Sequence, residues 1–190
     1  EHFAMLEQAA VAAMDCGDLE AAREYLAPLL QRFPPSTSLR TARLQGMFLE
    51  AQGDIRGALA LYDAAILRDP GASFAIKKRH VAAQWSAGMR SEAIAGLVTY
   101  LDFNMQDAEG WQQLMTWYIE EGRYQQAAYC GEELILLRPQ QQLYKLRYAD
   151  ILYALDRHAE SLRYYCAVLD ACPDHTAALM SLKLVTALLL

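Results

Sequence analysis

Residues 39–70, LRTARLQGMFLEAQGDIRGALALYDAAILRDP, decide the fold, because a helical pattern lies on each side of a single Gly-Asp pair. The spacing of small and apolar residues before and after Gly53 is that of one helix face. These residues are Leu39, Ala42, Gly46 and Leu49 on the first side, then Ala58, Leu61, Tyr62 and Ala65 on the second. Glycine permits the left-handed backbone that ends a helix, and Pro70 cannot continue the second helix. The stretch therefore predicts two antiparallel helices that approach closely at their small residues.

The pair that marks this turn recurs along the chain in steps of 36, 35, 34 and 34 residues. Its five copies are Gly17-Asp18, Gly53-Asp54, Gly88-Met89, Gly122-Arg123 and Asp156-Arg157, and all but the third are followed at a fixed distance by Pro34, Pro70, Pro139 or Pro173. We predict five helix pairs and a trailing helix, with boundaries at residues 3–35, 37–71, 73–106, 107–140, 141–173 and 174–190. Such an array is an all-α superhelical solenoid with a concave groove.

Three positions depart from the repeat. Ser161 stands where the fifth repeat needs a small Ala, Met105 replaces the expected Pro of the third repeat, and Pro28 is predicted to kink the second helix of the first. Trp117, like Tyr144 and Tyr153, does not match a position where the repeat needs bulk. For these three, a core role and a partner-binding role both remain open.

Composition narrows the class of protein. The 190 residues are 54% hydrophobic, which excludes intrinsic disorder, and the net charge of -6 opposes binding to nucleic acid. No apolar stretch is long enough to span a membrane. The four cysteines form no CxxC pair, so we expect reduced thiols and no metal site.

Catalytic motifs are missing from the sequence, which contains no GxGxxG, GxxxxGK, HExxH or GxSxG. The histidines are scattered over different repeats at positions that we expect to face solvent: His2, His80, His158 and His175. We therefore expect neither an enzyme nor a bound cofactor.

Binding by a surface is the function that remains. The first helices of a solenoid line its concave face, and their groove positions are Arg40, Arg43, Met47, Lys78, Trp85, Gln112, Thr116, Ile119 and Tyr153. We predict that a partner segment lies there, with its acids on Arg43 and Lys78 and its apolar side chains on Met47, Trp85 and Tyr153. The alternative for the basic residues is a solvated face balanced by nearby Asp and Glu.

The repeat resembles the tetratricopeptide repeat, most clearly in the fourth copy with Trp111, Leu114, Tyr118, Ala127 and Pro139. The groove positions of the first repeat are Glu7 and Val11, and the chain contains a single Asn, Asn104. These residues do not match the Lys, Arg and Asn clamp with which such repeats hold the acidic termini of chaperones.

Longer runs resemble the second subunit of the endoplasmic reticulum membrane protein complex. They include LQGMFLEA at 44–51, ALALYDAAILRDP at 58–70, AIKKRH at 75–80, EAIAGLVTYL at 92–101, YIEEGRYQQAAYCGEEL at 118–134 and PQQQLYKLRYADILY at 139–153. The similarity extends over about residues 8–180, in order. Members of that family continue beyond both ends of this chain, so we expect it to be an excerpt of a longer protein.

The resemblance implies a non-catalytic scaffold on the cytoplasmic side of the endoplasmic reticulum. It would belong to an insertase that places tail-anchored and multipass proteins into the membrane. The implied partners are the cytosolic tail of the fifth subunit and the soluble eighth or ninth subunit. A generic repeat adaptor for a peptide of another assembly is the alternative, and an enzyme whose catalytic part lies outside this chain is a third possibility.

Overall fold

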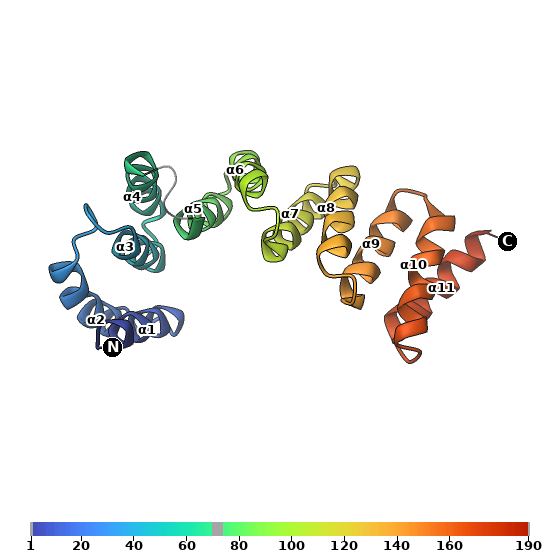
Figure 1. Cartoon of the computed structure of the whole chain (residues 1–190), viewed down its shortest axis with the longest axis horizontal. Coiled ribbons are helices and arrows are strands. Elements are labelled where there is room, and N and C mark those ends of the chain that lie inside the picture. Colours follow the sequence, from blue (N-terminus) through green and yellow to red (C-terminus); the bar gives the residue numbers. More distant parts are fainter. Residues whose placement is uncertain (1, 70–73, 190) are drawn as a thin grey trace. The chain divides into compact units, whose positions relative to one another are not determined.

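The computed structural model describes residues 2–69 and 74–189, and each element of regular structure within these ranges is an α-helix (Figure 1). The helices are α1 (His2–Asp15), α2 (Leu19–Arg32), α3 (Leu39–Ala51), α4 (Ile55–Arg68), α5 (Phe74–Ser86), α6 (Arg90–Phe103), α7 (Ala108–Glu120), α8 (Tyr124–Leu137), α9 (Gln142–Ala154), α10 (His158–Ala171) and α11 (Thr176–Leu189). Pro70, the expected end of the second repeat, lies outside the described residues.

The chain divides into two compact units, which we call unit 1 (Glu1–Tyr100) and unit 2 (Leu101–Leu190). In unit 1, α1 packs on α2 and α3 on α4. In unit 2, α7 packs on α8 and α9 on α10, which also contacts α11. First helices of successive pairs meet as well, because α3 contacts both α1 and α5, and α9 contacts α11.

The short turns inside the helix pairs have the left-handed backbone that the repeat predicted. Gly17, Gly53, Gly88 and Gly122 have φ between 69° and 84°. In the fifth pair Asp156 takes this conformation with φ 59°, and it is the one non-glycine residue with positive φ in the described part of the chain. The first helix of each pair therefore ends two residues before the marker residue.

Close helix packing explains the small residues of the second repeat. A Cβ atom added to Gly46 would lie 2.1 Å from Cε1 of Tyr62, whose ring is fully buried. The Tyr62 hydroxyl donates to Glu50 Oε1 at 2.6 Å, and Ala58 and Ala65 are buried in the same cluster. The prediction that small residues bring these two helices together is confirmed.

The departures from the repeat each have a local structural context. Ser161 is buried, and its hydroxyl donates to the Ala149 carbonyl at 2.9 Å, so the extra oxygen of Ser is satisfied. At the third boundary, the Trp111 indole donates to the carbonyl of Met105 at 2.9 Å. α2 continues through Pro28 to Arg32. Trp117, left open between core and surface, belongs to the core.

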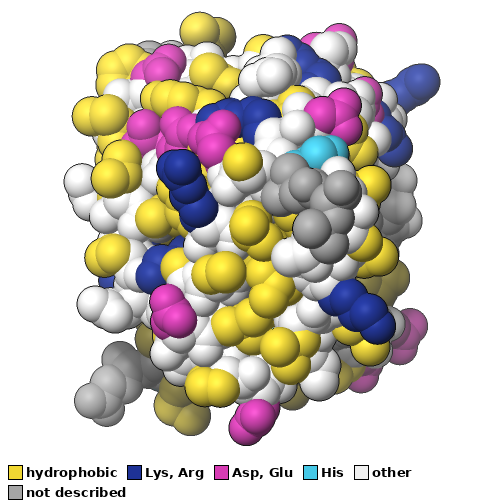
Figure 2. All heavy atoms as spheres, turned by 90° about the vertical axis from the view of Figure 1, so that its right-hand side faces the viewer, with side chains coloured by type: hydrophobic (Ala, Val, Ile, Leu, Met, Phe, Trp, Pro, Cys, Tyr) yellow, Lys and Arg dark blue, Asp and Glu magenta, His cyan; other side chains and the backbone are white. Residues whose placement is uncertain are grey.

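Within the described part of unit 2, the last helix, α11, has an exposed apolar face. Leu179, Met180, Leu184 and Leu188 are exposed along α11. Figure 2 views the molecule from the side on which α11 lies, and hydrophobic side chains gather in a band there. Across the described ranges, no helix combines the length and hydropathy that a membrane span requires.

Candidate binding site

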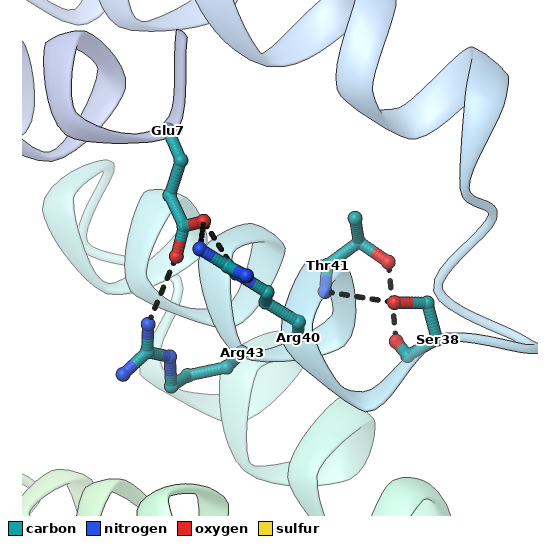
Figure 3. A network of polar contacts seen from close by, with 5 residues as sticks. All are labelled: Glu7, Ser38, Arg40, Thr41 and Arg43. Carbon is teal, nitrogen blue, oxygen red and sulfur yellow. Dashed lines mark hydrogen bonds and ion pairs between the residues drawn. The ribbon is translucent and has the colours of Figure 1, made fainter. Parts of the chain in front are cut away.

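A buried carboxylate joins two of the predicted groove residues. Arg40, through Nε and Nη2, donates to Oε2 of Glu7, and Arg43 Nη2 donates to Oε1 at 3.2 Å (Figure 3). Glu7 lies on α1, and the two arginines lie one turn apart on α3. Residues three apart share a helix face, so both guanidinium groups reach the same acid.

The first turn of α3 fixes the position of these arginines. The Ser38 hydroxyl caps the helix by accepting from the Thr41 N–H at 3.4 Å, and the Thr41 hydroxyl donates back to the Ser38 carbonyl at 3.1 Å. Such a cap favours helix initiation at this residue. The backbone of Arg40 therefore has a defined position, from which its side chain reaches Glu7.

The two arginines differ in their freedom to change partners. The side chain of Arg40 is 68% exposed, that of Arg43 is 33% exposed, and that of Glu7 is 12% exposed. The hydrogen bond and charge of Glu7 raise the pKa of Arg40, which therefore stays a cation. Because Arg40 is exposed and Arg43 also pairs with Glu7, Arg40 can turn to an external carboxylate while Arg43 keeps Glu7 paired.

A cavity of about 310 Å³ opens beside this ion-pair cluster. It is lined by Phe3, Ala4, Glu7, Leu29, Phe33, Ser38, Arg40, Thr41 and Leu44. Phe3 and Phe33 meet edge to face, with ring centroids 5.4 Å apart. A volume at the low end for ligand sites suits one or two apolar side chains of a partner.

Positive charge predominates around the cavity. Arg32 lies over the Phe33 ring, 5.4 Å from its centroid. Arg68 donates to the carbonyls of Pro35 and Ser36, in the segment that follows Phe33. Arg40 and Glu7 both line the cavity, and Arg43 adds a second positive charge beside Glu7, so the positive balance at this site favours an anionic ligand.

Other predicted residues of unit 1 have different environments. Met47 packs at the edge of the Ala13, Met14 and Ala22 cluster. Lys78 and Trp85 are half-buried on α5, and Arg90 lies 5.1 Å from the Trp85 ring centroid. Among the groove residues of unit 1, Arg40 and Arg43 meet on one carboxylate, that of Glu7.

Another basic residue of unit 1, Arg79, is balanced by an acid within the protein. Arg79 Nε donates to Glu50 Oε1 at 2.9 Å, on the same oxygen that accepts from Tyr62. Together with the Glu7 pairs, this contact agrees with the alternative of a balanced polar face. The exposed Arg40 is the part of that surface best placed to meet a partner.

The predicted residues of unit 2 lie on α7 and α9. Gln112 and Thr116 are exposed, and Ile119 is half-buried. Gln112 Oε1 accepts from the Tyr144 hydroxyl at 3.3 Å. Tyr153 is half-buried against His158, 5.2 Å between centroids, and lines a small cavity of about 110 Å³ with Asp150 and Leu184.

Three histidines, His80, His158 and His175, are half-buried and differ from the expectation that they face solvent. The side chain of His80 is 16% exposed and contacts Asp63 at 3.1 Å, and that of His158 is 23% exposed. Burial lowers the pKa of His80. The sequence pattern missed this because their neighbours come from other helices or from the helix start. In the described part of the chain, no group of three His, Cys, Asp or Glu side chains could hold a metal ion.

Sequence reasoning also missed the aromatic side of the cavity. Phe3 and Phe33 lie near the ends of α1 and α2, outside the periodic core positions. The available signal was Glu7, which occupies the first-repeat position that corresponds to the groove residues of later repeats. An acid there, before two arginines at the next repeat, could have indicated the pairing.

Comparisons with known proteins agree on one family. Residues 29–164 match the family described as the EMC2 TPR-like repeat domain. The ER membrane protein complex subunit 2-A of Xenopus laevis is 36% identical over 179 residues, covering 93% of this chain and 59% of that protein. The TPR repeat protein oca3 of Schizosaccharomyces pombe is 31% identical over 170 residues, covering 87% of this chain and 59% of that protein. The chain thus spans about three fifths of the length of these relatives.

Solved structures support the same fold at low sequence identity. A tetratricopeptide repeat protein from Parabacteroides merdae has a TM-score of 0.69 at 18% identity, covering 97% of this chain and 72% of the other. YrrB, described as a TPR protein with an unusual peptide-binding site, has a TM-score of 0.64 at 17% identity, covering 92% and 88%. The all-α tetratricopeptide fold predicted from the sequence is confirmed.

Proposed function

Because this chain belongs to the EMC2 family of TPR-like repeat domains, we propose that it is a non-catalytic scaffold within the ER membrane protein complex. It holds cytosolic segments of other subunits while membrane-embedded subunits insert tail-anchored and multipass proteins. The partners are the cytosolic tail of the fifth subunit and the soluble eighth or ninth subunit. Its place is peripheral, on the cytoplasmic side of the membrane.

The observation that supports a peptide-holding role most directly is the arginine-rich cavity of unit 1. Its apolar lining accepts a side chain, and the exposed Arg40 beside it accepts a carboxylate. The ligand of this site is an acidic peptide segment with an apolar anchor. Other helix pairs provide further contacts, each within its own unit. These residues are Lys78 and Trp85 on α5, and Gln112, Thr116, Ile119 and Tyr153 in unit 2.

Copurification tests the assembly. The tagged full-length protein is extracted from cells in mild detergent, and the retained proteins are identified by mass spectrometry. We expect the membrane-embedded subunits of the complex to be retained. Recovery of an unrelated set of proteins, with none of these subunits, would refute the scaffold role.

A second step tests the cavity. Arg40→Glu/Arg43→Glu reverses the charge beside it, and Arg23→Glu/Arg56→Glu makes the same charge change at two exposed residues of α2 and α4. We expect the first variant to lose at least one subunit and the second to retain all. Full retention by both, with normal folding by circular dichroism, would refute the proposed site without affecting membership of the complex.

A further inference from the structure

Unit 2 carries a second surface feature, unrelated to the arginine-rich cavity. Phe103, Met105, Tyr129 and Leu136 are 76%, 64%, 55% and 75% exposed, and we call them the aromatic patch. Large apolar side chains grouped on a surface mark interaction sites more often than isolated ones do.

Contacts with one buried ring, that of Trp111, join Tyr129 to the backbone of Met105. The Trp111 indole N–H donates to the Met105 carbonyl at 2.9 Å, and the Tyr129 ring meets Trp111 edge to face with centroids 5.9 Å apart. Leu136 follows Tyr129 by seven residues on α8, which puts both on one helix face. Phe103 ends α6, two residues before Met105.

The repeat itself does not need these residues. Tyr129 is the sixth residue of α8, and the sixth residues of α2, α4, α6 and α10 are Glu24, Ala60, Ala95 and Arg163. Leu136 is the thirteenth, where the other helices have Gln31, Leu67, Asp102 and Asp170. The large ring at Tyr129 is therefore particular to this helix pair.

The backbone beneath the patch is held by hydrogen bonds. The Asn104 N–H donates to the Leu101 carbonyl at 3.1 Å, and the Asp107 N–H donates to the Asn104 carbonyl at 3.0 Å. Asp107 also caps α7 by accepting from the Gly110 N–H at 3.1 Å. A partner that binds here meets a preformed surface and orders little of it on binding.

Acidic residues accompany the patch. The charge of Glu133, then its hydrogen bond, raises the pKa of Tyr129, and the charge of Asp102 adds to this effect. Residues 101–138 contain seven Asp and Glu against two basic residues, Arg123 and Arg138. The surroundings therefore attract cations, in contrast to the cavity of unit 1.

We propose that the aromatic patch binds a basic amphipathic peptide segment. Its apolar side chains lie on Phe103, Met105 and Leu136, and a Lys or Arg lies against the Tyr129 ring beside Glu133 and Asp102. A cation over an aromatic face and an acid close by favour the same residue type. The inference goes beyond the proposed function, because it holds for the chain in isolation.

Fluorescence anisotropy with designed peptides tests it. The probe is a labelled 18-residue amphipathic helix of Leu and Lys, and its counterpart replaces every Lys with Glu. The test variant is Tyr129→Ser/Leu136→Ser. The matched control is Leu67→Ser, which removes an 83% exposed leucine at the position on α4 that corresponds to Leu136.

We expect the Leu-Lys peptide to bind the unchanged chain and the Leu67→Ser variant alike. Binding to Tyr129→Ser/Leu136→Ser should be at least about tenfold weaker, with the helical circular dichroism signal retained at the assay temperature, because both side chains are more than half exposed. The Leu-Glu peptide should bind at least about tenfold more weakly than the Leu-Lys peptide.

Three results would overturn the proposal. The first is equal binding of the Leu-Lys peptide to the test variant and the control. The second is equal binding of both peptides to the unchanged chain. The third is self-association of the unchanged chain in sedimentation velocity that the test variant abolishes, since a second copy would then occupy the patch.

Discussion

Gly46 offers the sharpest test of the packing. In Gly46→Ala the new Cβ would lie 2.1 Å from the Tyr62 ring, which is fully buried and cannot move without breaking its hydrogen bond to Glu50. Alanine gains about 1 kcal/mol of helix propensity over glycine. Overpacking costs about 1–3 kcal/mol, and losing a hydrogen bond to a charged group costs about 1.5–3 kcal/mol. We expect the free energy of unfolding to fall by about 1.5–5 kcal/mol.

In a second background, Tyr62→Leu, the effect of Gly46→Ala on the free energy of unfolding should change sign. Tyr62→Leu removes the Cε1, Cζ and hydroxyl atoms that a Cβ at position 46 would meet. Added to Tyr62→Leu, Gly46→Ala should then stabilise the protein by up to about 1 kcal/mol through helix propensity alone.

Urea unfolding followed by circular dichroism measures all four members of this cycle. The slope of the free energy with urea must stay constant for the comparison to hold. Gly46→Ala that destabilises equally in both backgrounds would show that Tyr62 is not what excludes a side chain there.

Three further predictions concern titration, thiols and the arginine site. Burial, then the hydrogen bond to Asp150, raises the pKa of Tyr165 to about 12. As the pH rises, the Tyr165 hydroxyl therefore loses its proton in the unfolded chain before it does so in the folded chain. The free energy of unfolding should fall between about pH 10 and 12. Tyr165→Phe should reduce this fall in urea midpoints measured across that range, and an unchanged fall would contradict the assignment. Burial raises the pKa of the Cys130 thiol to about 12, whereas Cys16, Cys166 and Cys172 are exposed, so iodoacetamide should label three thiols in the native chain and all four in urea. Glu7→Gln releases both arginines from a charged partner and should strengthen binding of an acidic peptide several-fold in calorimetry; weaker binding would mean that Glu7 orients Arg40 for its ligand.

Much of the fold could be predicted from the sequence because local sterics determine it. Left-handed backbone at Gly53 and close packing at Gly46 follow from a missing side chain, and the recurrence of the turn defines the helix pairs. Asp156 fits the same turn because Asp tolerates this backbone better than most residues.

The candidate site was predicted less well because its contacts join distant parts of the chain. Arg40 and Arg43 were identified as groove residues, but their pairing with Glu7 joins α1 to α3 across more than 30 residues. Whether Trp117 is buried depends on the helices that surround it, which periodicity within α7 does not specify. The repeat pattern thus identified the groove positions, whereas the packing of neighbouring helices determines which of their charges are neutralised.

The fifth turn has an evolutionary consequence. Left-handed backbone at a residue with a side chain costs about 1 kcal/mol relative to glycine, and Asp156 bears that cost where four other turns do not. Aspartate and glycine codons differ by one nucleotide, so a single mutation can relieve the strain. Unit 2 therefore keeps a reserve of stability within one mutational step, and such a change could compensate for a destabilising substitution elsewhere in α9 or α10.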